Sequence, residues 1–398
     1  MPGLGSIALS VSIRGGSRWE GDNERGWAHL LEHMVFKGAG DRDARAIAEA
    51  VETNGAQINA STGFERTGFQ IRGLADSLSL GLDILADLVR APKLDDAELE
   101  REKQVVAQEI ADAADTPDDR IFDMVQSAAF PGQPLGRPIL GDVDSLKHAD
   151  GKTLSAFHRS LYSSDRIVVS AAGAVDEDRL LAEVEARFGD MTPVPRAEPA
   201  AATFAAGKIV EARKLEQAQL VLLTEGVPTH SPDYYALRLF AEILGGGMAS
   251  RLFQTVRETH GLCYAIDAYC ATYEDVGVLG VYAGTSAADA GPAAKLIIEG
   301  LARLAEDVTE AELARARAQL RAGLHMGRES PLARAEQAAG QLFVFGRLMD
   351  AGELEAGFNA VSLEDLRRTG QRAVEGPRAA GVLGPKAAAA AVKHFHGA

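Results

Sequence analysis

Two histidines and a glutamate near the amino terminus have the types and the spacing of a catalytic metal site. His29 and His33 are four residues apart in the run HLLEH, and Glu32 directly precedes the second histidine. On a helix the three side chains lie on one face, within one turn of each other. Two neutral imidazoles can ligate zinc, and a neighbouring carboxylate can accept a proton from the attacking water. The run therefore predicts a zinc site with Glu32 as the general base.

A catalytic zinc site needs a third protein ligand from another part of the chain. The predicted helix after Pro92 is the candidate donor, because it is rich in glutamate. Glu102 and Glu109 are seven residues apart on it, so they share one face, two turns from each other. A glutamate-rich face is often only solvated. Helical phase alone leaves both residues open as the third ligand.

The order of predicted elements repeats in the two halves of the chain. Residues 190–206 are rich in Pro and Ala and lack apolar periodicity, which predicts an interdomain linker. On either side helices alternate with strands, and AELARARAQL (311–320) resembles AELEREKQVV (97–106). We therefore predict an α+β fold of two tandem homologous domains, 1–189 and 207–398, each a mostly antiparallel sheet with helices packed on one face.

The candidate metal ligands occur in only one of the two copies. We align the glycines that follow the first helix of each copy, Gly38 and Gly246, and the two AEL runs. In this alignment each polar residue corresponds to an apolar residue or glycine of the second copy: His29 to Leu237, Glu32 to Phe240, His33 to Ala241, Glu102 to Ala316 and Glu109 to Gly323. A scaffold needs its apolar positions in both copies, so polar groups confined to one copy indicate a site added to a duplicated frame.

Composition and charge exclude several classes of function. The net charge is -16, with 41 basic against 57 acidic residues, which argues against a nucleic-acid partner and is compatible with basic peptides. No stretch approaches the ~18 apolar residues of a membrane helix, and the amino terminus lacks the features of a signal peptide. Cys263 and Cys270, predicted on opposite faces of one strand, suit reduced thiols. We expect a cytoplasmic protein without a membrane partner.

Five segments of the chain resemble the pitrilysin-type inverzincins, a family of zinc metallopeptidases that includes the mitochondrial processing peptidase, insulin-degrading enzyme and small bacterial peptidases. The segments are GSRWEGDNERGWAHLLEHMVFKG, QINAST, EREKQVVAQEI, PLGRPILGDVDSL and LGGGMASRLFQTVRETHGLCYAI. The resemblance covers most of the chain. It implies one zinc ion per chain and endopeptidase activity on unfolded peptides in an enclosed chamber.

The resemblance also implies roles for single residues. It makes His29, His33 and Glu109 the zinc ligands, Glu32 the general base, Glu102 a supporting carboxylate, Asn59, Ala60 and Ser61 part of a substrate-binding edge strand, and Arg257 and Tyr264 a pair that binds substrate and polarises the scissile carbonyl. Without the resemblance, Tyr264 is more simply a packed aromatic residue and Arg257 a surface cation.

The family resemblance further implies an assembly. Family members of this length build the chamber from two subunits, so we expect a homodimer in which Arg257 and Tyr264 act on the zinc site of the second chain. The alternative is a non-catalytic structural subunit, or one partner of a heterodimeric assembly like the processing peptidase. The complete HLLEH run argues against that alternative.

Overall fold

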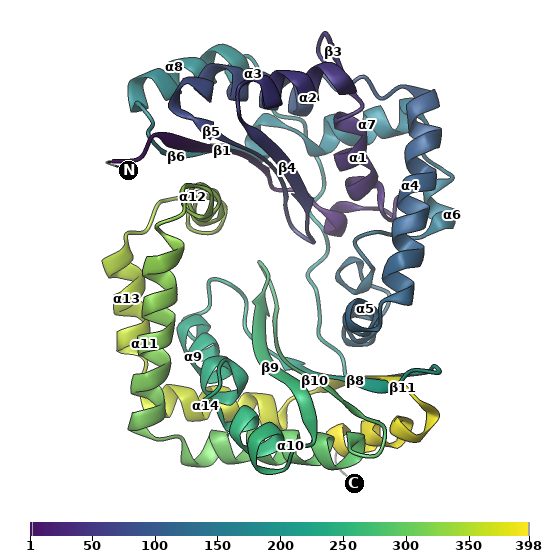
Figure 1. The fold of residues 1–398 in the computed structure, drawn as a ribbon, viewed down its shortest axis with the longest axis vertical. Coiled ribbons are helices and arrows are strands. Elements are labelled where there is room, and N and C mark those ends of the chain that lie inside the picture. Colours follow the sequence, from purple (N-terminus) through teal and green to yellow (C-terminus); the bar gives the residue numbers. More distant parts are fainter. Residues whose placement is uncertain (2, 397–398) are drawn as a thin grey trace. The chain divides into compact units, whose positions relative to one another are not determined.

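The protein folds as two compact units. The computed structural model describes residues 1 and 3–396 (Figure 1). The first unit comprises Met1–Ala111, Arg137–Ala200 and Met326–Leu348, and the second comprises Asp112–Gly136, Ala201–His325 and Met349–Ala398. Each unit contains one main sheet with helices packed against it, which confirms the predicted α+β class.

The first unit is built on a four-stranded antiparallel sheet in the order β4-β5-β1-β6. Its strands are β1 (Ser6–Ile13), β4 (Gln57–Thr62), β5 (Thr67–Leu74) and β6 (Ile167–Gly173), and β2 (Gly38–Ala39) pairs with β3 (Arg42–Asp43) separately. Its main helices are α1 (Trp27–Val35), α2 (Ala44–Thr53), α3 (Leu78–Arg90), α4 (Asp96–Asp115), α7 (Gly151–Leu161), α8 (Glu177–Phe188) and α12 (Pro331–Phe345).

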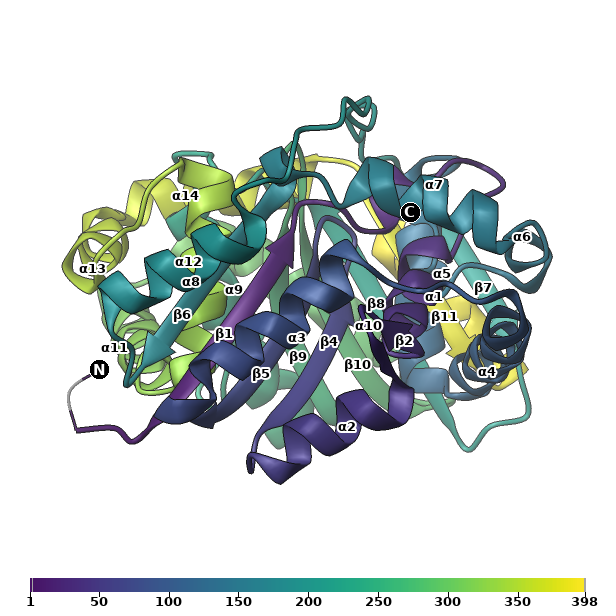
Figure 2. The same cartoon turned by 90° about the horizontal axis from the view of Figure 1, so that it is seen from above.

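The two faces of this sheet carry different residues because side chains alternate along a strand. In β1 the apolar residues at positions 7, 9, 11 and 13 join the core with α1 and α3, and α3 lies across β1 and β5 (Figure 2). The residues between them, such as Ser10 and Ser12, are small and lie on the opposite face, where α12 packs against β1 and β6. Ser170 Oγ on that face donates to the carbonyl of Ala335 at 2.8 Å, so the helix backbone comes close to the sheet.

The second unit is built on a five-stranded sheet in the order β7-β11-β8-β10-β9, antiparallel except for the pair β7 and β11. Its strands are β7 (Gly207–Ala212), β8 (Gln217–Glu225), β9 (Cys263–Thr272), β10 (Gly277–Ser286) and β11 (Arg378–Gly384). Its main helices are α5 (Pro117–Ala129), α9 (Tyr234–Gly245), α10 (Ala290–Asp307), α11 (Glu310–Gly327), α13 (Ala351–Ala360) and α14 (Leu363–Glu375). Helices α9, α10 and α14 form the core with one face of this sheet.

One helix in each half of the chain packs on the sheet of the other half. Helix α5 belongs to the first half, yet it contacts β7, β8 and β11 (Figure 1). Helix α12 belongs to the second half, yet it contacts β1 and β6. The units are therefore discontinuous and differ from the predicted domains 1–189 and 207–398, and each sheet carries a helix on its second face as well.

Local signals in the sequence account for most element boundaries. The side chain of Asp43 accepts a hydrogen bond from the backbone N–H of Ala46 at 2.8 Å and so caps α2, as expected for an aspartate at this position. Residues 190–206, the predicted linker, form neither helix nor strand. Residues 397 and 398 of the predicted second domain lie outside the described residues. In the described part of the chain, no helix has the length and apolar content to cross a membrane.

Candidate active site

Helix α1 presents His29, Glu32 and His33 on one side and buries the other side. Leu30, Leu31, Met34 and Val35 are buried in the core of the first unit, whereas the three polar residues are partly exposed. The apolar side therefore holds the helix against the sheet, and the polar side faces α4.

The two imidazoles converge on one carboxylate of α4. Glu109 Oε2 lies 3.7 Å from His29 Nε2 and 3.5 Å from His33 Nε2. A metal ion can be held by three or more His, Cys, Asp or Glu side chains whose ligand atoms lie close together. Within the described part of the chain, His29, His33 and Glu109 form such a group, with all three ligand atoms within 4.8 Å of one another. The structure thus brings together the three predicted ligands, which are 80 positions apart at most in a 398-residue chain.

Glu102 has a different place from Glu109. Its Oε2 lies 3.1 Å from His33 Nδ1, and its Oε1 lies 2.7 Å from the Lys37 ammonium group. An ionised carboxylate only accepts, so Nδ1 of His33 carries the proton and Nε2 keeps a free lone pair toward Glu109. The geometry separates the two glutamates that helical phase left open: Glu109 lies beside the Nε2 atoms of both histidines, and Glu102 contacts Nδ1 of His33.

The donor set fits a zinc ion. Ligands at 2.0–2.2 Å from a tetrahedral zinc lie roughly 3.4 Å from each other, close to the 3.7 and 3.5 Å that separate Glu109 Oε2 from the two nitrogens. Burial, with a smaller contribution from His33, lowers the pKa of His29 to about 4, so its imidazole is neutral at pH 7. Its Nδ1 is buried without a hydrogen-bond partner among the described residues, so no neighbour sets its tautomer as Glu102 does for His33.

The general base predicted from the sequence is held by strand β4. Thr62 at the end of β4 donates its hydroxyl hydrogen to Glu32 Oε2 at 2.6 Å. Burial raises the pKa of Glu32, and the Thr62 hydrogen bond and His33 oppose that rise. Burial, and after it the charge of Glu32, raises the pKa of Tyr162. Sequence reasoning missed Thr62 as a site residue, although it ends the QINAST run that resembled the family.

Strand β4 has one free edge. It pairs with β5 from Gln57 to Thr62 and lies at the end of the sheet, so its other edge has no partner strand in the described structure. Asn59, Ala60 and Ser61 are on this strand, next to the end that holds Glu32. An unpaired edge of this kind can accept an extended peptide through main-chain hydrogen bonds.

A buried glutamate fixes the start of α1. The Glu20 carboxylate accepts hydrogen bonds from the backbone N–H of Gly26 at 3.0 Å and of Ala28 at 2.8 Å, and the residue is 3% exposed. These are donors that the first turn of a helix leaves unpaired. Sequence reasoning missed this role, because the capping side chain lies six residues before the glycine that it contacts.

Two glycines allow a second segment to hold the same helix start. Gly26 (φ 83°) and Gly141 (φ 71°) adopt left-handed conformations, and a Cβ on either would clash with the backbone of the other segment. Trp27 Nε1 donates to the carbonyl of Ser145 at 3.2 Å, and Arg25 pairs with Asp142 at 2.8 Å. The segment PLGRPILGDVDSL therefore positions the helix that carries the histidines.

Arg257 and Tyr264 lie together in the second unit. The Arg257 guanidinium carbon is 5.2 Å from the centre of the Tyr264 ring, a cation–π contact. Tyr264 occupies a β-bulge, since Gly284 pairs with Ala265 and Thr285 with Cys263, and its side chain is 80% exposed. The bulge turns the tyrosine outward, so the interpretation of Tyr264 as a packed aromatic residue is wrong.

The same bulge corrects the expectation for the cysteines. Seven positions along a regular strand would put Cys263 and Cys270 on opposite faces. The extra residue shifts the alternation, and both thiols contact the same core cluster. Both are free cysteines, and burial raises the pKa of each thiol.

The burial pattern also corrects the alignment of the two repeats. Along α1, residues 27–35 are buried except at His29, Glu32 and His33. Along α9, residues 236–244 are buried except at Arg238 and Glu242. Core packing therefore pairs His29 with Arg238 and His33 with Glu242, one position from the alignment based on glycines. The three consecutive glycines after α9 allowed either register, and only core contacts decide it.

Comparison with known proteins adds independent evidence. Residues 5–143 match the model of Insulinase (Peptidase family M16), and residues 149–320 match that of the Peptidase M16 inactive domain. The chain belongs to peptidase family M16. A Rickettsia bellii protein named an uncharacterized zinc protease is 34% identical over 97% of this chain and 94% of its own length. A Bacillus subtilis protein with the same description is 35% identical over 91% of this chain and 89% of its own length.

A solved structure has the same fold. The crystal structure of a protease from Helicobacter pylori superposes with a TM-score of 0.88 at 22% identity, covering 96% of this chain and 95% of that one. This likeness shows that the two chains share one fold.

We predict that Glu109 and Glu102 differ in their effect on zinc binding. Glu109→Gln removes a ligand and should abolish stoichiometric zinc binding, whereas Glu102→Gln should weaken it about 10–100-fold, as loss of an outer carboxylate does. Glu100→Gln, on the exposed side of the same helix, is the matched control and should bind zinc like the parent. Zinc affinity is measured by competition with a coloured chelator. Equal affinity of the Glu102 and Glu109 variants would contradict the assignment.

We predict that Glu20 stabilises α1. Glu20→Ala leaves two buried N–H groups without a partner and should lower the free energy of unfolding by about 1–3 kcal/mol, with a parallel loss of zinc affinity. Asp22→Ala, at an exposed neighbouring acid, is the control. The measurement is denaturant unfolding of the metal-free chain together with the zinc competition assay. An unfolding curve that superposes on that of the parent would exclude the capping role.

Proposed function

We propose that this protein is a zinc-dependent endopeptidase that cleaves unfolded peptides. The observation that carries the proposal is the meeting of His29, His33 and Glu109 beside a carboxylate, Glu32, that is bonded to an edge strand. The M16 family match and the relatives named zinc proteases support it.

Each residue of the site has a distinct task in this proposal. His29, His33 and Glu109 would hold one zinc ion, which supplies Lewis-acid polarisation of the scissile carbonyl and a water of lowered pKa. Glu32 accepts a proton from the attacking water and later donates it to the leaving amine. Thr62 keeps the Glu32 carboxylate oriented through its hydroxyl group.

The free edge of β4 supports binding of the substrate as an added strand. Main-chain hydrogen bonds along Asn59, Ala60 and Ser61 would hold an extended peptide with its scissile bond next to Glu32. This mode requires an unfolded segment, because a folded protein does not offer an extended backbone. The net charge of -16 favours basic peptides.

We further propose that the active form is a cytoplasmic homodimer in which Arg257 and Tyr264 act on the zinc site of the second chain. Tyr264 has an exposed hydroxyl, which suits a donor to the oxyanion that forms at the scissile carbonyl. Arg257, stacked on the ring, holds the tyrosine in place. A readily solvated tyrosine turned outward by a bulge has no role in the core of its own unit.

We predict that peptide cleavage requires both zinc and Glu32. The zinc-loaded wild type should cleave members of a diverse library of unfolded peptides, and a chelator should abolish cleavage until zinc is restored. Glu32→Gln should lower kcat by at least about 10²-fold, since general base catalysis contributes 10²–10⁴-fold, while it retains zinc. Mass spectrometry of the products is the measurement. Absence of any cleavage by the zinc-loaded wild type would instead support the non-catalytic subunit.

We predict that two inactive variants complement each other. Glu32→Gln chains keep Tyr264, and Tyr264→Phe chains keep Glu32, so a mixed dimer contains one complete site if the pair acts between chains. Mixing the two after dissociation should restore up to about a quarter of wild-type activity, because random pairing makes half the dimers mixed and each carries one of two sites. Mixtures as inactive as their parents would exclude action between chains.

A further inference from the structure

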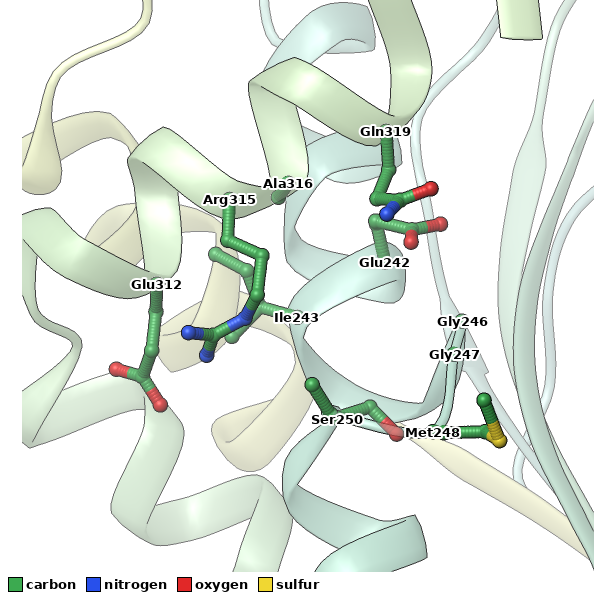
Figure 3. Close-up of a pocket in the computed structure, with 11 residues that line it drawn as sticks. Glu242, Ile243, Gly246, Gly247, Met248, Ser250, Glu312, Arg315, Ala316 and Gln319 are labelled. Carbon is green, nitrogen blue, oxygen red and sulfur yellow. The ribbon is translucent and has the colours of Figure 1, made fainter. Parts of the chain in front are cut away.

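A cavity in the second unit lies between α9 and α11, the two helices that correspond to α1 and α4 of the first unit. Its volume is about 330 Å³, and it is bounded by the end of α9, the glycine segment that follows and α11 (Figure 3). The corrected repeat alignment pairs Glu242 in its wall with His33, and the AEL runs pair Ala316 in its wall with Glu102. The cavity is therefore the counterpart of the space in which α1 meets α4.

The cavity exists because small residues replace large ones. In the first unit the Glu102 side chain bridges the two helices and reaches His33. In the second unit Ala316 is 3% exposed and ends in a methyl group, so the equivalent space is left open. Glycine at 246 lets the Glu242 carboxylate fold over the loop, because a Cβ there would clash with Glu242 Oε2.

Arg315 in the cavity wall lacks the ion pair that the corresponding arginine of the first unit forms. In the first unit the corresponding Arg101 pairs with Glu98, three residues before it. In the second unit the corresponding acid, Glu312, bonds to Arg251 at 2.7 and 2.8 Å and to the Thr309 backbone at 3.0 Å. Arg315 therefore has no ion pair or hydrogen bond among the described residues.

Two further wall residues have polar groups that form no hydrogen bond to another described residue. Ser250 is 5% exposed, and its Oγ has no hydrogen-bond partner within the described residues. The Glu242 carboxylate forms no hydrogen bond there either; burial and then the charge of Asp267 raise its pKa, against a smaller effect of Arg238. Figure 3 shows the ends of the Glu242 and Gln319 side chains close together, and the Arg315 side chain extending from α11 past Ile243, with its guanidinium group on the side of Glu312.

We propose that this cavity binds a small zwitterion, either a free amino acid or a short peptide, with its ammonium group on Glu242 and its carboxylate group on Arg315. A simple anion would be repelled by Glu242, and a simple cation by Arg315, whereas a zwitterion pairs both. The Ser250 hydroxyl offers a further hydrogen bond. The volume falls at the small end of ligand cavities, about 300–1,000 Å³. The ligand's origin as a cleavage product rests on the proposed function; its recognition rests on the cavity alone.

The test is isothermal titration of the zinc-loaded, full-length Glu32→Gln chain with L-alanyl-L-alanine, a probe that this variant does not hydrolyse. Glu242→Gln and Arg315→Gln, each added to that chain, should weaken binding about tenfold or more, the loss expected for one charged hydrogen bond. Arg101→Gln is the matched control in the first repeat and should bind like the parent. If the dipeptide bound at the zinc site, its affinity would be equal in all of these variants. A loss of affinity in Arg315→Gln therefore identifies the cavity as the binding site.

Modified probes assign each end of the ligand. N-acetyl-alanyl-alanine, which lacks the ammonium group, should bind the parent about tenfold more weakly than alanyl-alanine, and the two probes should bind Glu242→Gln equally. Alanyl-alanine amide, which lacks the carboxylate group, should likewise bind the parent more weakly than alanyl-alanine, and the two should bind Arg315→Gln equally. Free alanine that binds as tightly as the dipeptide identifies an amino acid site, and weaker binding identifies a peptide site. Ala316→Met, which fills the space, should abolish binding, with its unfolding curve as the check on folding.

Two results would overturn the proposal. One is absence of binding by both alanine and the dipeptide, and the other is binding that is unchanged in the Glu242 and Arg315 variants. If the wild type still cleaves peptides, either result removes only the cavity ligand. Binding that depends on Arg315 in a chain that cleaves nothing would instead remove the proposed peptidase activity and leave the cavity assignment in place.

Discussion

The buried Glu102 carboxylate joins the two helices that carry the predicted zinc site. It contacts His33 on α1 and Lys37 just beyond the end of α1, and it projects from α4. A buried carboxylate without a cation is costly, so the Lys37 contact lets this charge remain between the helices. With the helices held at this point, Glu109 reaches both imidazoles from two turns further along α4. Positions of the ligands relative to each other depend on this contact.

The surroundings of α1 hold it in place from three further directions. Its apolar side packs in the core, the Glu20 carboxylate caps its first turn, and Thr62 fixes Glu32 from the edge strand. A catalytic group must be held to within a fraction of an ångström, and contacts from several independent elements achieve this. Together with Ser145, whose carbonyl accepts a hydrogen bond from Trp27, the residues in these contacts are spread from Glu20 to Ser145 in the sequence, so the site depends on distant parts of the first unit.

The two units share one arrangement of a helix packed on a sheet, but this helix carries different polar groups in each unit. Burial along α1 and α9 follows the same pattern, because each helix must cover a sheet with its apolar side. The partly exposed positions do not have to be apolar. They are occupied by His29, Glu32 and His33 in the first unit and by Arg238 and Glu242 in the second. Loss of the glutamate between the helices converts a filled contact into a cavity lined by charges of both signs. Duplication thus supplies a second place at which side chains can converge.

Much of the site was readable from the sequence, because helical periodicity is a local property. The spacing of His29, Glu32 and His33 determined that they share a face, and the glutamates of α4 were evident as candidate ligands. The family resemblance, and not the spacing, favoured Glu109 over Glu102, and only the packing of α1 against α4 decided their contacts. Tertiary structure alone also determined the exchange of α5 and α12, the outward turn of Tyr264 at a bulge, and the register of α9. Each of these depends on which surfaces a distant segment covers, and residue spacing along the chain carries no information about that.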